Sequence, residues 1–314
     1  MTSAHQELQN ASSPSKPVVL GRPPRNFWLY DPTTKAYDLT HPPTPASTPV
    51  QPRLSVATAT GSSITIDPAK TALVVIDMQN FFLSPALGKN PSSKGAEAEK
   101  VLLDLALPAA RDAGIQIVWL NWGLSEEDLD AMPPTAFRGF GMSEVGKEGE
   151  PGPFGGGEVA KDCGLGEDMG KAIVEGGREI HVGRKLMKGQ WNTQMTPRLM
   201  EEYKSSLKTK QPDKWLDKDR LSGLWQKDTM AMKWLREQGM RTLLFAGVNT
   251  DQCVLSTLQD ASHHGFDCVL LRDACGTTSP DSAREAAEWN CRKVWGFQTS
   301  CQEFVKGVDN VGKK

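Results

Sequence analysis

The stretch "LLFAGVNTDQCVLSTLQDASHHG", residues 243–265, begins as an apolar β-strand and ends as an amphipathic helix. A strand followed by a helix is the repeating unit of a parallel α/β sheet. Cys253 lies at the junction, where the positive end of the helix dipole and a nearby lysine would favour a thiolate. This cysteine is therefore a candidate nucleophile, although a single cysteine at such a position is more often a buried structural residue.

The same alternation of strand and helix runs through most of the chain. The apolar run "TALVVID" at residues 71–77 is typical of a strand buried on both faces, and a helical segment that stops at Gly114 leads into a second strand, "IQIVWLNW". We predict an α/β fold with a doubly wound, mostly parallel six-stranded sheet and helices on both faces. The other four strands are expected at residues 179–184, 241–248, 267–275 and near 293–300.

Two parts of the chain do not follow this pattern. Residues 1–66 are rich in Pro, Ser and Thr but contain the aromatic cluster "NFWLYD", which predicts an extended arm that docks by its aromatic side chains. We assign residues 67–314 to one domain with insertions at about 123–178 and 205–225. Because the first insertion follows a strand and is unusually long, we expect it to form one wall of a binding pocket.

Composition excludes several classes of function. The chain has 36 basic and 38 acidic side chains, so no overall field attracts nucleic acid or an anionic membrane. No run reaches the roughly 18 apolar residues that a spanning helix needs, and the first residues do not resemble a secretory signal. The six cysteines form no CxxC pair. We therefore expect a cytoplasmic protein with reduced thiols that acts on a small molecule.

Three chemically active side chains follow predicted strands. They are Asp77, Lys185 and Cys253, and the carboxyl ends of parallel strands are where open α/β sheets bind ligands. A thiol with an ammonium and a carboxylate beside it is a cysteine nucleophile with its activators. Each residue alone also has a structural interpretation, because acids cap turns and lysines occur in solvated loops.

Three motifs resemble those of the isochorismatase-like cysteine hydrolases. They are "ALVVIDMQNFF", "RKLMKGQW" and "AGVNTDQCVLSTLQDASHHGFDCVLLRDACG", in the family's order, and the resemblance covers roughly residues 71–304. It implies a catalytic triad of Asp77, Lys185 and Cys253. In the family's lysine loop, a small residue lies four places after the lysine and an aromatic residue six places after, and Gly189 and Trp191 occupy those positions.

The resemblance also implies the surroundings of the triad. A cis peptide would lie between Val248 and Asn249, and it would direct backbone N–H groups, including that of Cys253, towards an oxyanion. Arg138, in the first insertion, could bind a substrate carboxylate through two hydrogen bonds. The residues that we expect to contact substrate are Gln79, Phe82, Trp122, Phe137, Arg138, Trp191 and Asn249.

The chain departs from the family pattern at two places. Phe81 stands where the family usually has Asp, and no Asp-x-His pair follows "WLNWG", so we predict no zinc and no cofactor. Since the branch that hydrolyses isochorismate does not require the thiol, Cys253 favours hydrolysis of a C–N bond in a small amide, carbamoyl or ureido compound. Two alternatives are isochorismate hydrolysis with release of pyruvate, and a non-catalytic binding scaffold. Family members are usually dimers or tetramers, so a homo-oligomer is expected.

Overall fold

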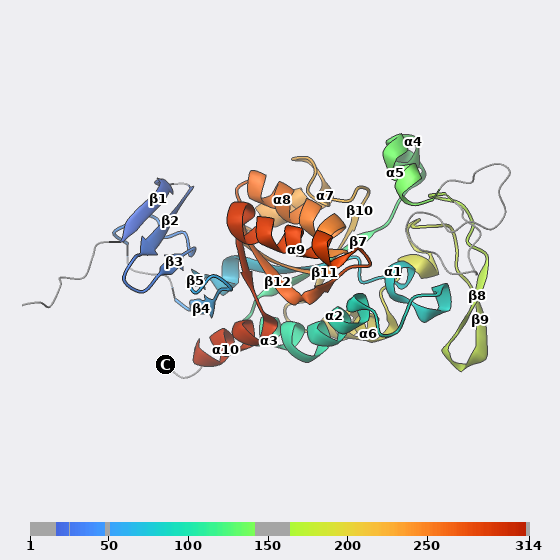
Figure 1. Ribbon diagram of the computed structural model, residues 1–314, viewed down its shortest axis with the longest axis horizontal. Helices are drawn as coiled ribbons and strands as arrows, with labels where there is room; N and C mark the ends of the chain where they lie inside the picture. The colour runs from blue at the N-terminus through green and yellow to red at the C-terminus, as the bar shows by residue number, and fades with distance from the viewer. Residues whose placement is uncertain (1–16, 25, 48–50, 142–163, 312–314) are drawn as a thin grey trace, which may run out of the picture.

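A computed structural model describes residues 17–24, 26–47, 51–141 and 164–311 of the chain (Figure 1). Its centre is a six-stranded sheet in which all neighbouring strands are parallel. In spatial order the strands are β10 (Lys214–Lys218), β7 (Gln116–Trp122), β6 (Thr71–Ile76), β11 (Thr242–Val248), β12 (Asp267–Gly276) and β13 (Phe297–Thr299).

The two central strands, β6 and β11, are buried along their whole length, as their continuous apolar sequences predict. They pair from Thr242 opposite Thr71 to Gly247 opposite Ile76. Gly247 has φ +115°, and a Cβ atom there would lie 2.0 Å from the carbonyl oxygen of Ile76. Only glycine therefore allows the end of β11 to approach β6 this closely, just before the segment that carries Cys253.

Helices cover both faces of the sheet, which confirms the predicted fold class (Figure 1). One face carries α7 (Met230–Glu237), α8 (Leu255–His263) and α9 (Asp281–Asn290), with the π-helical turns η6 (Thr250–Val254) and η7 (Cys291–Trp295). The other carries α2 (Lys94–Val101), η3 (Leu102–Ala106), α3 (Leu107–Asp112), α6 (Pro197–Ser206) and α10 (Cys301–Val311). In the part of the chain that the structure describes, no helix is long and apolar enough to span a membrane.

One of the six strands predicted for the central sheet, at residues 179–184, is wrong. The segment at 179–184 overlaps β9 (Arg178–His181), which pairs antiparallel with β8 (Lys171–Val174) in a separate hairpin. The strand that completes the sheet is β10, inside the segment predicted as a second insertion. An edge strand has a neighbour on one side only, so it tolerates the charged side chains of "KWLDK" and lacks a continuous apolar run.

The carboxyl ends of the strands are covered by short elements. They gather at the end of the molecule opposite the N-terminal strands (Figure 1). They are α1 (Asn80–Leu83), α4 (Glu126–Asp130), α5 (Pro134–Gly139), the β8–β9 hairpin, and the turns η2 (Pro85–Leu87), η4 (Glu175–Gly177) and η5 (Trp191–Thr193). Residues 142–163 of the first predicted insertion, which include the glycine-rich stretch at 152–158 and Cys163, lie outside the described residues.

The described part of the N-terminal segment is a small sheet rather than the extended arm predicted from its composition. Its order is β1 (Val18–Arg22), β2 (Asn26–Asp31), β3 (Ala36–Asp38), β5 (Ser63–Ile66) and β4 (Leu54–Ala57). The turn η1 (Pro68–Lys70) joins it to β6. Its inward-facing residues, among them Leu54, Ile64 and Ile66, are part of the same hydrophobic cluster as α3 and α10.

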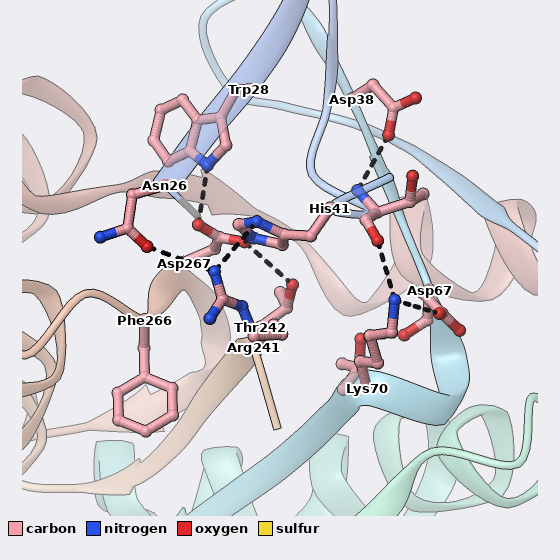
Figure 2. A network of polar contacts seen from close by, with 12 residues as sticks. Asn26, Trp28, Asp38, His41, Asp67, Lys70, Arg241, Thr242, Phe266 and Asp267 are labelled. Atoms are coloured by element: carbon pink, nitrogen blue, oxygen red, sulfur yellow. Dashed lines mark hydrogen bonds and ion pairs between the residues drawn. The ribbon is translucent and has the colours of Figure 1, made fainter. Parts of the chain in front are cut away.

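A polar network fixes this sheet to the amino ends of β11 and β12 (Figure 2). The Asp267 carboxylate accepts hydrogen bonds from Trp28 Nε1 at 2.7 Å, from His41 Nε2 at 2.6 Å and from Thr242 Oγ1 at 3.4 Å. Arg241 Nη2 lies 3.2 Å from His41 Nδ1. Because a guanidinium can only donate, Nδ1 of His41 accepts the hydrogen bond from Arg241. Nε2 of His41 then carries the hydrogen and donates the hydrogen bond to Asp267.

We expect Asp267→Ala to lower the free energy of unfolding by about 3 kcal/mol, because it leaves the partly buried donors of Trp28 and His41 without an acceptor. Urea unfolding followed by tryptophan fluorescence measures the change. Glu179→Ala, which removes an exposed surface pair with Lys171, is the control and should cost below about 0.5 kcal/mol. Equal losses in the two variants would show that the network does not stabilise the fold.

Candidate active site

Asp77 directly follows β6 and is fully buried. Its backbone has φ +54°, a left-handed conformation that is uncommon outside glycine. Oδ1 accepts a hydrogen bond from the backbone N–H of Trp122 at 3.2 Å, and Oδ2 lies 3.0 Å from Nζ of Lys218. The left-handed turn thus places the carboxylate against the carboxyl ends of β7 and β10, in the manner of strained residues at functional sites.

Cys253 lies in η6, the π-helical turn that follows β11, and its side chain is buried. The peptide bond between Val248 and Asn249 is cis, at the position that the family resemblance implies. The carbonyl oxygen of Asn249 accepts hydrogen bonds from the N–H groups of Gln252 and Val254. The Cys253 thiol and the Asp77 carboxylate are close enough for each to shift the pKa of the other, so the ends of β6 and β11 bring the predicted acid and thiol together.

Burial controls the protonation of this pair. It raises the pKa of the Cys253 thiol to about 12, although the positive charge of Lys218 acts in the opposite direction. Burial also raises the pKa of Asp77, again against the attraction of Lys218. The sequence predicted a lowered thiol pKa, and that expectation is wrong because loss of solvent outweighs the nearby ammonium. In the resting site the thiol therefore keeps its proton.

The ammonium in contact with Asp77 belongs to Lys218, the last residue of β10, and not to Lys185. Lys218 is 4% exposed, and its Nζ lies 4.0 Å from the centre of the Trp122 ring and donates to the carbonyl of Arg220 at 3.0 Å. Lys185 is also buried, but its Nζ donates to the carbonyl oxygen of Phe140 at 2.7 Å. The sequence-based assignment therefore missed Lys218.

Gln79 was predicted to contact substrate, but its side chain makes hydrogen bonds within the protein. Its Nε2 donates to the carbonyl oxygens of Trp122 and Thr193, both at 2.8 Å, and its Oε1 accepts from the N–H of Trp122 at 3.1 Å. The side chain is fully buried. Gln79 therefore ties the ends of β6 and β7 to the turn η5, and its effect on substrate is indirect.

An aromatic wall borders the site formed by Asp77, Cys253 and Lys218. The Trp122 and Phe140 rings pack edge to face with centroids 5.0 Å apart, and the Phe140 centroid lies 6.4 Å from that of Phe81. The indole Nε1 of Trp122 is buried and has no partner with hydrogen-bond geometry among the described residues. Because Phe140 follows α5, the described first part of the insertion at 123–178 does contact the candidate site.

The other predicted substrate residues are placed less centrally. Phe82 packs edge to face on Phe81 with centroids 4.9 Å apart, and Phe137 is half-buried against the core. Arg138 is exposed, and Trp191 is half-buried at the start of η5. Asn249 is half-buried and donates through Nδ2 to Gln252 Oε1 at 3.2 Å.

No group of three or more His, Cys, Asp or Glu side chains among residues 17–24, 26–47, 51–141 and 164–311 is arranged to hold a metal ion. The reactive groups of the site are the thiol of Cys253, the carboxylate of Asp77 and the ammonium of Lys218. These three groups can attack an electrophilic carbon, transfer a proton and balance charge.

The raised thiol pKa predicts an unusual pH profile for alkylation of Cys253. Only the thiolate reacts, so the rate constant with iodoacetamide should rise about tenfold per pH unit from about pH 9 towards about pH 12. A short peptide with a free cysteine, as the control, should level off near its own pKa. Peptide mapping by mass spectrometry gives the rate at Cys253. A plateau near pH 9 would contradict the proposed effect of burial.

Comparisons with known proteins agree with the fold and with the sequence motifs. Residues 183–303 match the model of the isochorismatase domain, which confirms the resemblance seen in the sequence motifs. A cysteine hydrolase from Pseudomonas syringae pv. phaseolicola 1448A superposes with a TM-score of 0.52 at 17% identity, over 78% of this chain and 95% of that one. An isochorismatase family protein from Desulfovibrio vulgaris subsp. vulgaris str. Hildenborough gives 0.50 at 20% identity, over 78% and 99%. At these identities the two structures show a shared fold.

Proposed function

Because residues 183–303 belong to the isochorismatase domain family, we propose that this chain is a hydrolase that cleaves a C–N bond in a small amide, carbamoyl or ureido compound with Cys253 as nucleophile. The observation that carries the proposal is one buried carboxylate, Asp77, whose Oδ2 lies 3.0 Å from the ammonium of Lys218 and whose charge acts on the thiol of Cys253 at the end of the neighbouring strand. A thiol beside a proton acceptor is the arrangement that covalent catalysis requires.

The proposed reaction has two halves. In the first, Sγ of Cys253 attacks the carbonyl carbon while its proton moves to Asp77, and the C–N bond then breaks as Asp77 gives that proton to the leaving nitrogen. In the second, Asp77 takes a proton from water, the resulting hydroxide attacks the thioester, and the C–S bond breaks as the proton returns to Sγ. Asp77 thus acts as base and acid in turn, and the enzyme returns to its starting state.

Lys218 is the proposed electrostatic partner in both halves. Its ammonium favours the ionised form of Asp77 against the effect of burial, and it also favours the negative charge that develops on sulfur and oxygen. For the oxyanion we propose the turn formed by Val248, Asn249 and Cys253, with the backbone N–H of Cys253 as a donor. Preformed donors of this kind need no rearrangement when the charge develops.

A screen of primary amides, N-carbamoyl compounds and ureides for ammonia release tests this proposal. The wild-type protein should hydrolyse at least one class, and Asp77→Asn, which keeps the shape of the side chain but cannot accept a proton, should not. Isochorismate is included, with pyruvate as the measured product. Pyruvate release that persists in Cys253→Ala, together with no ammonia from any compound, would replace the amidase by the isochorismate alternative.

We also propose that the protein forms a homo-oligomer and acts in the cytoplasm, as predicted from the family resemblance and the composition. Light scattering decides the first point. A mass equal to one chain of 34.3 kDa at micromolar concentration would overturn it.

A further inference from the structure

Lys185, which does not take its predicted place against Asp77, is held in a closely packed loop. Asn192 is fully buried at the centre of this loop, and its Oδ1 accepts from the N–H of Leu186 at 2.9 Å. Its Nδ2 donates to the carbonyl oxygens of Val182 and Arg184 at 3.0 and 2.9 Å. Leu186 is fully buried with φ +57°, a conformation that leucine rarely adopts. The surrounding contacts therefore fix the loop, and with it the buried position of Lys185.

A second lysine, Lys89, approaches the same aromatic ring as Lys185. Nζ of Lys89 is 5.7 Å and Nζ of Lys185 is 6.0 Å from the centre of the same Phe81 ring. Among the described residues no carboxylate pairs with Lys89. Burial, followed by the charge of Lys185, lowers the pKa of Lys89. Two ammonium groups that repel each other in a partly desolvated place are stabilised by an anion that binds near both of them.

These two lysines are next to the candidate active site. Phe81 is in α1, which begins three residues after Asp77, and the carbonyl of Phe140 accepts the hydrogen bond of Lys185. The Phe140 ring packs on Trp122, and the ammonium of Lys218 lies over the Trp122 ring. One aromatic pair, with centroids 5.0 Å apart, therefore separates the two lysines from the ammonium that contacts Asp77.

We propose that Lys89 and Lys185 bind a carboxylate of the substrate, and that the substrates are therefore acids with an amide or ureido group several bonds away from the carboxylate. This inference rests on the proposed function, because it assigns the scissile carbonyl to Cys253. Lysine ammonium groups are common ligands for carboxylates, and the Phe81 ring, which both ammonium groups approach, supports the aliphatic part of such a substrate.

The kinetic test compares an acid with its neutral counterpart. The half-amide of adipic acid and hexanamide differ by one carboxylate, and wild type should favour the half-amide by about 10- to 100-fold in kcat/KM. Lys89→Met should remove most of this ratio by raising KM for the half-amide, with kcat nearly constant, and Lys89→Arg should keep it. Lys94→Met, an exposed lysine paired with Glu97, is the control and should leave the ratio unchanged. An unchanged ratio in Lys89→Met would overturn the proposal.

A binding test separates this proposal from the proposed function. Adipate is titrated calorimetrically into Cys253→Ala, so no reaction is needed. Binding that is weakened about tenfold or more by Lys89→Met supports the carboxylate site even if no amide is hydrolysed. Adipate that does not bind, or binds equally well to Cys253→Ala with and without Lys89→Met, overturns the site whatever the outcome of the amide screen.

Discussion

Cys253→Ala is expected to lower kcat/KM for the true substrate by at least about 10⁴-fold, because removing the nucleophile of a covalent mechanism leaves only binding and electrostatic stabilisation. The side chain is 3% exposed and its thiol lies within the electrostatic influence of Asp77, so truncation removes the attacking atom and little of the surrounding structure. Single-turnover kinetics with the substrate found in the amide screen, together with circular dichroism of both proteins, measures the effect.

The matched control is Cys268→Ala. Cys268 is equally buried, but it lies near the amino end of β12, where its thiol donates to the carbonyl of Leu258. We expect its loss to change kcat/KM by less than about threefold, in line with a core substitution away from the site. Iodoacetamide should label Cys253 before the other described cysteines. Full activity in Cys253→Ala would refute covalent catalysis by this thiol.

The central part of the site could be predicted from sequence for a physical reason. Asp77 and Cys253 follow β6 and β11, whose continuous apolar runs mark them as strands buried on both faces. Strand ends of this kind meet at one edge of a parallel sheet, so the strand pattern places the two side chains at the same edge, and the family resemblance then selected them as a catalytic pair. The thiol pKa could not be predicted correctly, because burial of the site depends on the whole fold.

The sequence motifs selected Lys185 instead of Lys218, just as the search for apolar runs selected a strand at 179–184 instead of β10. Lys185 has Gly189 and the aromatic Trp191 at the offsets of the family's lysine loop, whereas Lys218 has the small Ser222 but Leu224 at those offsets. The motif therefore favoured Lys185. Lys218 ends β10, an edge strand whose charged sequence hides it from a search for apolar runs. Pairing of β10 with β7, which no local pattern encodes, places this lysine at the site.

The N-terminal sheet shows another limit of local patterns. Its strands have three to six residues and are joined by turns rich in Pro and Thr, so composition alone predicted an extended arm. The aromatic cluster did indicate docking, since Trp28 contacts Asp267. Pairing of β3 with β5 joins residues about 27 positions apart and depends on the complete fold.

Lys218→Met is expected to lower kcat by about 10³-fold, because it removes the ammonium that contacts Asp77 while keeping the length of the side chain. Without this charge the pKa of Asp77 rises further, so a larger share of the carboxyl groups is protonated and cannot accept the thiol proton. By contrast, Lys185→Met should raise KM for carboxylate-bearing substrates and leave kcat within about threefold of wild type. A loss of kcat in Lys185→Met with normal kcat in Lys218→Met would restore the assignment made from the sequence motif.

Lys218→Met should also change how the free energy of unfolding depends on pH. The pKa of Asp77 in the folded protein lies above its ordinary value of 3.8, so the folded state holds a proton that the unfolded state has lost. The stabilisation from this proton is complete below pH 3.8 and is lost as pH rises through the folded pKa. Because Lys218→Met raises that folded pKa, its free energy of unfolding should fall more steeply with rising pH than that of wild type, with a cost of about 3–5 kcal/mol once the buried carboxylate is ionised without a partner. Urea unfolding from about pH 4 to about pH 8 measures the two curves, and parallel curves would show that Lys218 does not stabilise the charge on Asp77.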